Sequence, residues 1–135
     1  MDAFDADCLI YAAVAEHPLG KRVARVFVEG ADSGVVGMGS VLLLPELLSK
    51  PLSTGDTDQL GRLTTLLGRL ELHAVDHETG LLSVQLAANY RLKAADAVHL
   101  ATAVHHGADR FLTNNRRDFK RDLIVEIDVV HPDQI

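Results

Sequence analysis

The sequence predicts an α/β fold, a three-layer sandwich in which a mainly parallel central sheet is flanked by helices. Short apolar segments alternate with longer segments of helical periodicity over most of the chain, as in βαβ units. The length of 135 residues, without internal repeat, linker or low-complexity segment, predicts a single domain over residues 1–135. The composition, 47% hydrophobic and 24% charged, is that of an ordinary folded domain.

The first half of the chain contains two expected strands separated by a helix. Residues 3–9 are apolar apart from two aspartates and favour a short strand that runs out into a loop. Residues 18–30, PLGKRVARVFVEG, have apolar side chains at helical spacing and end in a glycine typical of a helix stop. Residues 33–39 are β-branched and punctuated by glycine, which favours a second strand. Ser40 is placed as the N-cap of a helix over VLLLPELL.

The second half continues the alternation. Leucines in helical register predict a helix over residues 54–70, and a third strand is expected over residues 72–75. Two further helices are expected over residues 77–90 and 94–106, with basic residues at the break between them. The last expected elements are two strands, residues 111–113 and 123–130. In such sheets the functional crevice lies at the carboxyl ends of the strands, so polar residues there are candidates.

The charge distribution argues against a protein that holds nucleic acid by bulk electrostatics alone. The net charge is −6, whereas phosphate contacts need Lys or Arg. The positive charges gather near the C-terminus, at Arg110, Arg116, Arg117, Lys120 and Arg121. A solvated charged loop is the default interpretation of this cluster. It is also the best candidate for a phosphate-facing patch, with Arg116 and Arg117 as the candidate nucleic-acid-binding residues.

Several features favour a cytoplasmic location. Cys8 is the one cysteine, so no internal disulfide can form. The acidic Asp2 follows Met1 directly, with no basic and apolar stretch typical of a signal peptide. No apolar run approaches the ~20 residues that a membrane-spanning helix needs, so no membrane association is expected.

Asp96 is an unusual residue for its segment, LKAADAVHLATAV. On a helix it shares a face with Leu92 and Leu100, and that face is otherwise apolar. A carboxylate against a core is costly unless it is paired. Two interpretations remain open: Asp96 reaches water at the edge of a partly buried helix, or its partner is a metal ion.

Other acidic residues have equally ordinary local interpretations. Asp5 and Asp7 are expected on one side of the chain at the end of the first strand, where they would form either a solvated turn or a repelling pair that needs a cation. Glu46 could form a surface pair with Lys50, four residues later on a helix. The histidines form no obvious convergent pair on one helical face, and we expect them to be surface or hydrogen-bonded residues.

The order of these features resembles the PIN-domain family, and most closely its small single-domain VapC-type toxins. The resemblance extends over nearly the whole chain and rests on four pieces in order: FDADCLIY, Ser40 with Glu46 six residues later, AADAVHLATA, and LTNNRRDF. The Glu46 segment is the least specific of the four. The family fold is the α/β sandwich predicted above.

The resemblance implies a metal-dependent ribonuclease that hydrolyses RNA phosphodiester bonds as the toxin of a type II toxin–antitoxin pair. It also implies Mg²⁺ or Mn²⁺ as cofactor, a cognate antitoxin protein as partner, and a homodimer. The residues that match the family's catalytic positions are Asp5, Glu46, Asp96 and Asp118. Asp5 and Asp96, with Asn115, are the expected metal ligands, and the expected supporting residues are Asp7, Ser40 and Thr113.

The sequence departs from the family pattern at the fourth acidic position. The family often has Thr-Asn-Asp there, and the aligned residue is the amide Asn115. Asn115 could contribute a neutral oxygen, Asp118 could take over the position, or a second metal could be held less tightly. Asp7 stands where the family commonly has Asn or Ser, and could offset the loss.

Two other functions remain open. A catalytically decayed PIN-like binding module is compatible with Asn115 and with the negative net charge. A haloacid-dehalogenase-type phosphatase would use Asp5 as nucleophile and Asp7 as general acid. However, Leu9 stands where that family has Thr or Val, its late paired-Asp metal motif is absent from the sequence, and it leaves Asp96 unexplained.

Overall fold

The computed structural model describes residues 1–14, 16–29 and 34–135. Its central sheet has five strands in the order β3-β2-β1-β4-β5, and each pair of neighbours is parallel. The strands are β1 (Asp2–Phe4), β2 (Gly37–Ser40), β3 (Leu70–His73), β4 (Arg110–Leu112) and β5 (Asp128–Val130). The predicted α/β sandwich around a mainly parallel sheet is therefore confirmed.

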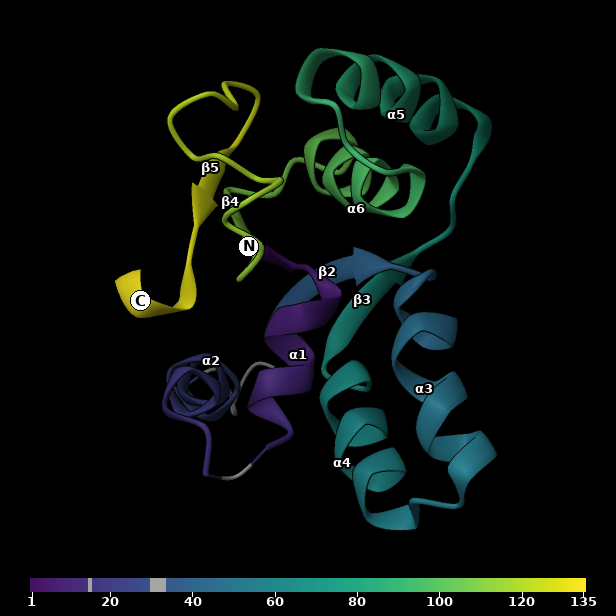
Figure 1. The fold of residues 1–135 in the computed structure, drawn as a ribbon, viewed down its shortest axis with the longest axis vertical. Coiled ribbons are helices and arrows are strands. Elements are labelled where there is room, and N and C mark those ends of the chain that lie inside the picture. Colours follow the sequence, from purple (N-terminus) through teal and green to yellow (C-terminus); the bar gives the residue numbers. More distant parts are fainter. Residues whose placement is uncertain (15, 30–33) are drawn as a thin grey trace.

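Helices cover both faces of the sheet. On one face lie α1 (Ala6–Ala12), α2 (Pro18–Glu29), α3 (Leu43–Thr54) and α4 (Thr57–Leu67), and on the other lie α5 (His77–Tyr90) and α6 (Ala94–His105) (Figure 1). A short 3₁₀ turn, Pro132–Gln134, ends the chain beside α2. Connections between parallel strands need such crossover helices, which is why strands and helices alternate in the sequence.

The central strands β1 and β4 contribute to two hydrophobic clusters because successive side chains point to opposite faces of the sheet. Ala3 and Phe111 pack in the cluster under α5 and α6, whereas their neighbours Phe4 and Leu112 pack in the cluster under α1 to α4. Strands buried on both faces read as short continuous apolar runs rather than as alternating ones. Their ends are therefore hard to locate from the sequence.

The first strand differs most from the prediction, because it ends at Phe4 instead of Leu9. Asp5 is the N-cap of α1, and its side chain accepts a hydrogen bond from the backbone N–H of Ala6 at 2.9 Å. The remainder of FDADCLIY is thus helical. An aspartate before an apolar run is an ordinary N-cap signal, which explains the difference.

Smaller differences occur elsewhere. Ser40 is the last residue of β2, and its hydroxyl accepts a hydrogen bond from the backbone N–H of Leu42 ahead of α3. The helix predicted over residues 54–70 is the shorter α4, capped by Asp56. β3 lies two residues earlier than expected, and the last strand is confined to its final three residues. Gly30 and Ser33, placed at predicted element ends, lie outside the described residues.

The helices α5 and α6 agree with the prediction to within one residue. Among the described residues, no helix is long and apolar enough to cross a membrane.

Candidate functional site

The carboxyl ends of three neighbouring strands bring the candidate residues together. Because β1 is hydrogen-bonded to β2 on one side and to β4 on the other, all in parallel, Phe4, Ser40 and Leu112 end at one edge of the sheet. Asp5 and Thr113 are the next residues on β1 and β4, and the backbone N–H of Asp5 donates to the carbonyl of Leu112 at 2.9 Å. This edge is the predicted crevice position.

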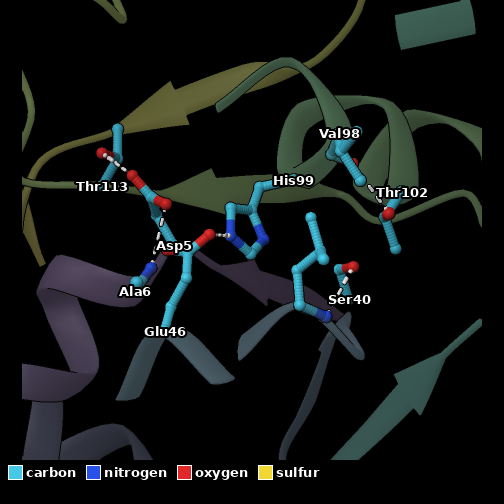
Figure 2. Close-up of polar contacts among 9 residues, drawn as sticks. Asp5, Ala6, Ser40, Glu46, Val98, His99, Thr102 and Thr113 are labelled. Atoms are coloured by element: carbon cyan, nitrogen blue, oxygen red, sulfur yellow. Dashed lines mark hydrogen bonds and ion pairs between the residues drawn. The ribbon is translucent and has the colours of Figure 1, made fainter. Parts of the chain in front are cut away.

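Asp5 lies deepest in the site and is only 4% exposed. One carboxylate oxygen accepts from the backbone N–H of Ala6, and the other accepts from the Thr113 hydroxyl at 2.8 Å (Figure 2). Burial and the neighbouring charge of Asp7 raise the pKa of Asp5 to about 7, although His99 and the two hydrogen bonds act in the opposite direction. Near neutral pH the protein thus has an acid that requires a cation to ionise fully.

Asp7 lies beside Asp5, but not for the reason that the sequence suggested. It is in the first turn of α1 rather than on the strand, and one of its oxygens accepts a hydrogen bond from the backbone N–H of Asn114 at 3.1 Å. Burial raises its pKa. The two carboxylates are therefore neighbours through a helix N-terminus, which itself favours negative charge.

Glu46 and His99 form a hydrogen-bonded pair across two elements, α3 and α6. The Nε2 of His99 lies 2.9 Å from the Oε1 of Glu46 (Figure 2). The His99 side chain is 1% exposed and that of Glu46 is 34% exposed. Among the described residues the Glu46 carboxylate has this partner in place of the expected Lys50.

The hydrogen bonding of His99 indicates its tautomer. Its Nδ1 is buried and has no partner in the described part of the chain. A buried N–H without an acceptor is rarer than an unused lone pair, so in neutral His99 the proton belongs on Nε2. We infer that Nε2–H donates to the Glu46 carboxylate. In the sequence His99 is not distinguished from the other histidines, so this contact was not predicted. The available signal was that His99 follows Asp96 by three residues, on the same helical face.

Asp96 is half-buried in the first turn of α6, and its carboxylate has no hydrogen-bond partner among the described residues. Burial raises its pKa most, followed by the charge of Asp118 and then by that of Glu46, while His99 and Lys93 lower it. Asp96 is thus at the edge of its helix, as the first interpretation expected, and also faces other acids. His99 is the shared basic neighbour of Asp5 and Asp96.

Asn115 and Asp118 bind each other in the turn after β4. The Asn115 side-chain amide donates to Asp118 Oδ2 at 2.9 Å, and the backbone N–H of Asp118 donates to Asn115 Oδ1 at 3.2 Å. Both polar ends of the Asn115 side chain are therefore occupied by Asp118. The charge of Asp118 raises the pKa of Asp96, so the two carboxylates are neighbours.

The remaining candidates lie farther from the carboxylates. The Ser40 hydroxyl is fully buried and binds the backbone of Leu42, so it orders the start of α3 (Figure 2). Arg116 is ion-paired with Asp133. Arg117 is exposed and lines a pocket beside Asp118.

The donor set fits a hard divalent cation held jointly by protein and substrate. Five carboxylates form a chain of neighbours in which Glu46, Asp5 and Asp96 adjoin the buried imidazole of His99, and three of the five have raised pKa values. No group of three or more His, Cys, Asp or Glu side chains within residues 1–14, 16–29 and 34–135 is arranged to enclose a metal by itself. Mg²⁺ is usually held by one or two carboxylates together with water and substrate phosphate, so full enclosure is not required. The five acids are Asp5, Asp7, Glu46, Asp96 and Asp118.

Fold and site together define a class: an α/β protein with an acidic crevice at the carboxyl edge of a parallel sheet. The family model for the PIN domain matches residues 3–122, and the chain belongs to this family.

Two solved structures are similar in fold. A chain from a toxin–antitoxin complex of Klebsiella pneumoniae has a TM-score of 0.76 at 23% identity, and the match covers 100% of both chains. A chain from VapBC2 of Rickettsia felis, bound to a DNA fragment from the promoter of that pair, has a TM-score of 0.74 at 17% identity. That match covers 96% of this chain and 97% of the other. No curated protein sequence matched.

Proposed function

We propose that the protein is a divalent-metal-dependent ribonuclease that hydrolyses RNA phosphodiester bonds and acts as the toxin of a toxin–antitoxin pair. The observation that carries the proposal is the group of carboxylates at the sheet edge, which lacks enough positive charge of its own. Membership of the PIN domain family, whose members are generally nucleases, supports the reaction class. The two similar folds come from toxin–antitoxin complexes, which supports the biological role.

Asp5 and Asp96 would hold the cation, and Glu46 and Asp118 would complete the acidic rim. When bound, Mg²⁺ or Mn²⁺ would neutralise charge on the scissile phosphate and lower the pKa of an attacking water. Thr113 donates to one oxygen of Asp5 and holds the carboxylate in one orientation. Asp7 adds negative charge behind Asp5 and therefore strengthens the attraction for a cation.

Two residues act through others. His99 is a positioning residue that holds the half-exposed carboxylate of Glu46 in one orientation. Asn115 has the same role for Asp118, because its amide donates to that carboxylate. We therefore propose Asp118 as the fourth acid and Asn115 as its support, instead of Asn115 as a direct ligand. Charged ligands oriented by neutral or cationic donors are the usual arrangement around metals.

A cognate antitoxin is the proposed protein partner, and a cytoplasmic homodimer is the proposed form of the toxin. An acidic crevice of this kind suits an arginine, which can make a bidentate contact with paired carboxylates and so take the place of a cation. Exposed apolar side chains on α3 and α5, such as Leu52 and Leu81, are available for contact between subunits.

The alternatives have less support. Asp7, the general acid that a phosphatase would need, is in the first turn of α1, and one of its oxygens accepts from the backbone N–H of Asn114, so no observation favours the phosphatase. A decayed binding module would keep the fold but lose the metal requirement.

One assay tests the function against both alternatives. The purified protein is incubated with structured RNA and, in parallel, with a small phosphomonoester. We expect RNA cleavage that stops in excess chelator and returns with Mg²⁺ or Mn²⁺, and no phosphomonoester hydrolysis. Undiminished RNA cleavage in chelator would contradict the metal mechanism. Absence of cleavage at any metal concentration would favour the decayed module.

A further inference from the structure

A second pocket adjoins the acidic site and shares Asp118 with it. Its volume is about 430 Å³, within the range of pockets that bind small ligands. One wall is the end of α5, and the other is the connection between β4 and β5, drawn in yellow in Figure 1. The residues that matter here are Tyr90, Arg91, Arg117, Asp118, Lys120 and Ile124.

The pocket contains three cationic side chains that the fold leaves unpaired. Arg91, Arg117 and Lys120 are exposed, and within the described ranges none of their side chains has a hydrogen bond or an ion pair. Other basic residues do have partners: Arg110 binds Asp2 through two hydrogen bonds, and Arg116 pairs with Asp133. In a chain of net charge −6, three unpaired cations around one cavity indicate a site for an anion.

The backbone at Arg91 is a second, independent observation. Arg91 ends α5 with φ 54° and ψ 44°, the left-handed conformation that favours glycine. It is the one non-glycine residue with positive φ among the described residues. Arginine at this position costs stability relative to glycine, and strain of this kind is common at ligand sites. A guanidinium that binds a ligand in the pocket would offset this cost.

The rest of the pocket suits the other parts of a nucleotide. The Tyr90 hydroxyl donates to Glu126 Oε2 at 2.9 Å and accepts from the backbone N–H of Val125 at 3.4 Å, which holds the connection against α5. Tyr90 and the buried Ile124 supply aromatic and aliphatic surface. Arginine and lysine recognise phosphate, and an aromatic ring provides a surface for a base.

We propose that this pocket binds a nucleotide of single-stranded RNA next to the scissile bond, with its phosphate on Arg91, Arg117 and Lys120. The inference rests on the proposed ribonuclease function and extends it by assigning a substrate subsite. Asp118 lies between the two sites, so an RNA strand held in the pocket continues directly into the acidic crevice.

The test measures RNA binding without catalysis. Fluorescence anisotropy of a labelled single-stranded RNA is recorded in chelator, with the wild-type protein and with Arg91→Gly and Lys120→Gln. Each variant should bind about three- to tenfold more weakly, and the slope of log affinity against log salt should fall by about 0.7 for each lost contact. Lys21→Gln, which removes an exposed unpaired cation from α2, is the matched control and should bind like the wild type.

Arg91→Gly separates a binding role from a structural one. Glycine suits the left-handed backbone, so the melting temperature should stay the same or rise while RNA affinity falls. Unchanged affinity in both pocket variants, or an equal loss in Lys21→Gln, would overturn the subsite. Displacement of RNA by inorganic phosphate as efficiently as by a mononucleotide would overturn the assignment of a nucleotide.

The metal-dependent cleavage assay distinguishes failure of the proposed subsite from failure of the proposed nuclease function. If wild-type protein cleaves RNA but the pocket variants show an unchanged KM, only the subsite is wrong. If wild-type protein binds RNA through the pocket but never cleaves it, only the nuclease function is wrong. If it does not bind RNA at all, both are wrong. The supporting result is a raised KM with little change in kcat for Arg91→Gly and Lys120→Gln.

Discussion

At the scale of single residues, the site is defined by carboxylates whose ionisation the fold opposes. Asp5, Asp7 and Asp96 have raised pKa values, and burial is the largest cause in each case. His99 offsets part of this effect for Asp5 and Asp96 but is held by Glu46. Such carboxylates lower the stability of the folded protein when no cation is bound, and they favour the binding of a cation.

The first prediction concerns Asp96→Asn in metal-free buffer. The pKa of Asp96 is raised above its unfolded value of 3.8, so its contribution to stability is complete below pH 3.8 and is lost as the pH rises through the folded-state pKa. Asparagine is uncharged and has nearly the same volume, so it removes this pH-dependent loss of stability. The substitution breaks no hydrogen bond, because the Asp96 carboxylate makes none with the described residues. We expect a melting temperature about 2–4 °C above wild type at neutral pH, a modest gain because Asp96 is half-exposed.

The pH series provides the check. Thermal melts in chelator should show a difference between Asp96→Asn and wild type that is near zero at the acid end and grows with pH. Asp122→Asn, at an exposed and unpaired position, should show no such growth. A lower melting temperature for Asp96→Asn at neutral pH would show instead that the carboxylate has a structural role.

The second prediction concerns His99 as the positioning residue for Glu46. His99→Leu should lower kcat for RNA cleavage about 10- to 100-fold with little change in melting temperature, because the site is buried and leucine fills it. His99→Gln should recover much of the activity, since its amide nitrogen can reach the position of Nε2, whereas the shorter His99→Asn should not.

A double-mutant cycle with Glu46→Gln isolates the contact. The effect of His99→Leu should largely disappear in the Glu46→Gln background. Equal losses in both backgrounds would mean that His99 acts independently of Glu46.

At the scale of elements, the site depends on how the segments after β1 and β4 begin. Asp5 both caps α1 and faces the crevice, so the same side chain ends the strand and starts the site. After β4, Asn115 and Asp118 close a turn through reciprocal hydrogen bonds. This turn presents Asp118 toward Asp96 and brings Arg117 and Lys120 to the neighbouring pocket.

The third prediction concerns this turn. Asp118→Ala should cost activity comparable to that lost in Asp96→Asn, because both remove a carboxylate from the rim. Asn115→Asp should not lower the metal concentration needed for half-maximal activity, since it replaces the donor to Asp118 with a second negative charge. The check is the metal concentration for half-maximal activity, measured by titration for both variants and for Asn114→Ala as a control. A lower metal requirement in Asn115→Asp would instead identify position 115 as the ligand position.

The elements also show what a sequence can predict. The boundaries of α5 were predicted to the residue, and in the structure Asp76 caps its first turn. The end of β1 was not predicted correctly, since Asp5 and Asp7 suit a strand end as well as a helix N-terminus. The candidate acids could be named only through the resemblance to the PIN-domain family. The contact of His99 with Glu46 could not, because it joins residues 53 positions apart whose side chains meet only after α3 and α6 pack on the sheet.

At the scale of the whole molecule, charge is separated into two adjoining regions. The acidic crevice lies at the sheet edge, and unpaired cations line the pocket beyond Asp118. This separation reconciles a net charge of −6 with an RNA substrate. In the proposed function the cations would bind the flanking phosphate, and the acids would hold the metal that contacts the scissile phosphate.

The central claim is that the sheet-edge carboxylates bind a divalent cation. Titration of Mn²⁺ into metal-free protein, followed by electron paramagnetic resonance of the free ion, tests this without any RNA. We expect saturable binding at neutral pH that weakens at least tenfold in Asp96→Asn and is unchanged in Asp122→Asn. Binding should also weaken as the pH falls through the pKa of Asp5, which is raised to about 7. Binding that is equal in wild type and Asp96→Asn, or that is insensitive to pH between 5 and 8, would contradict it.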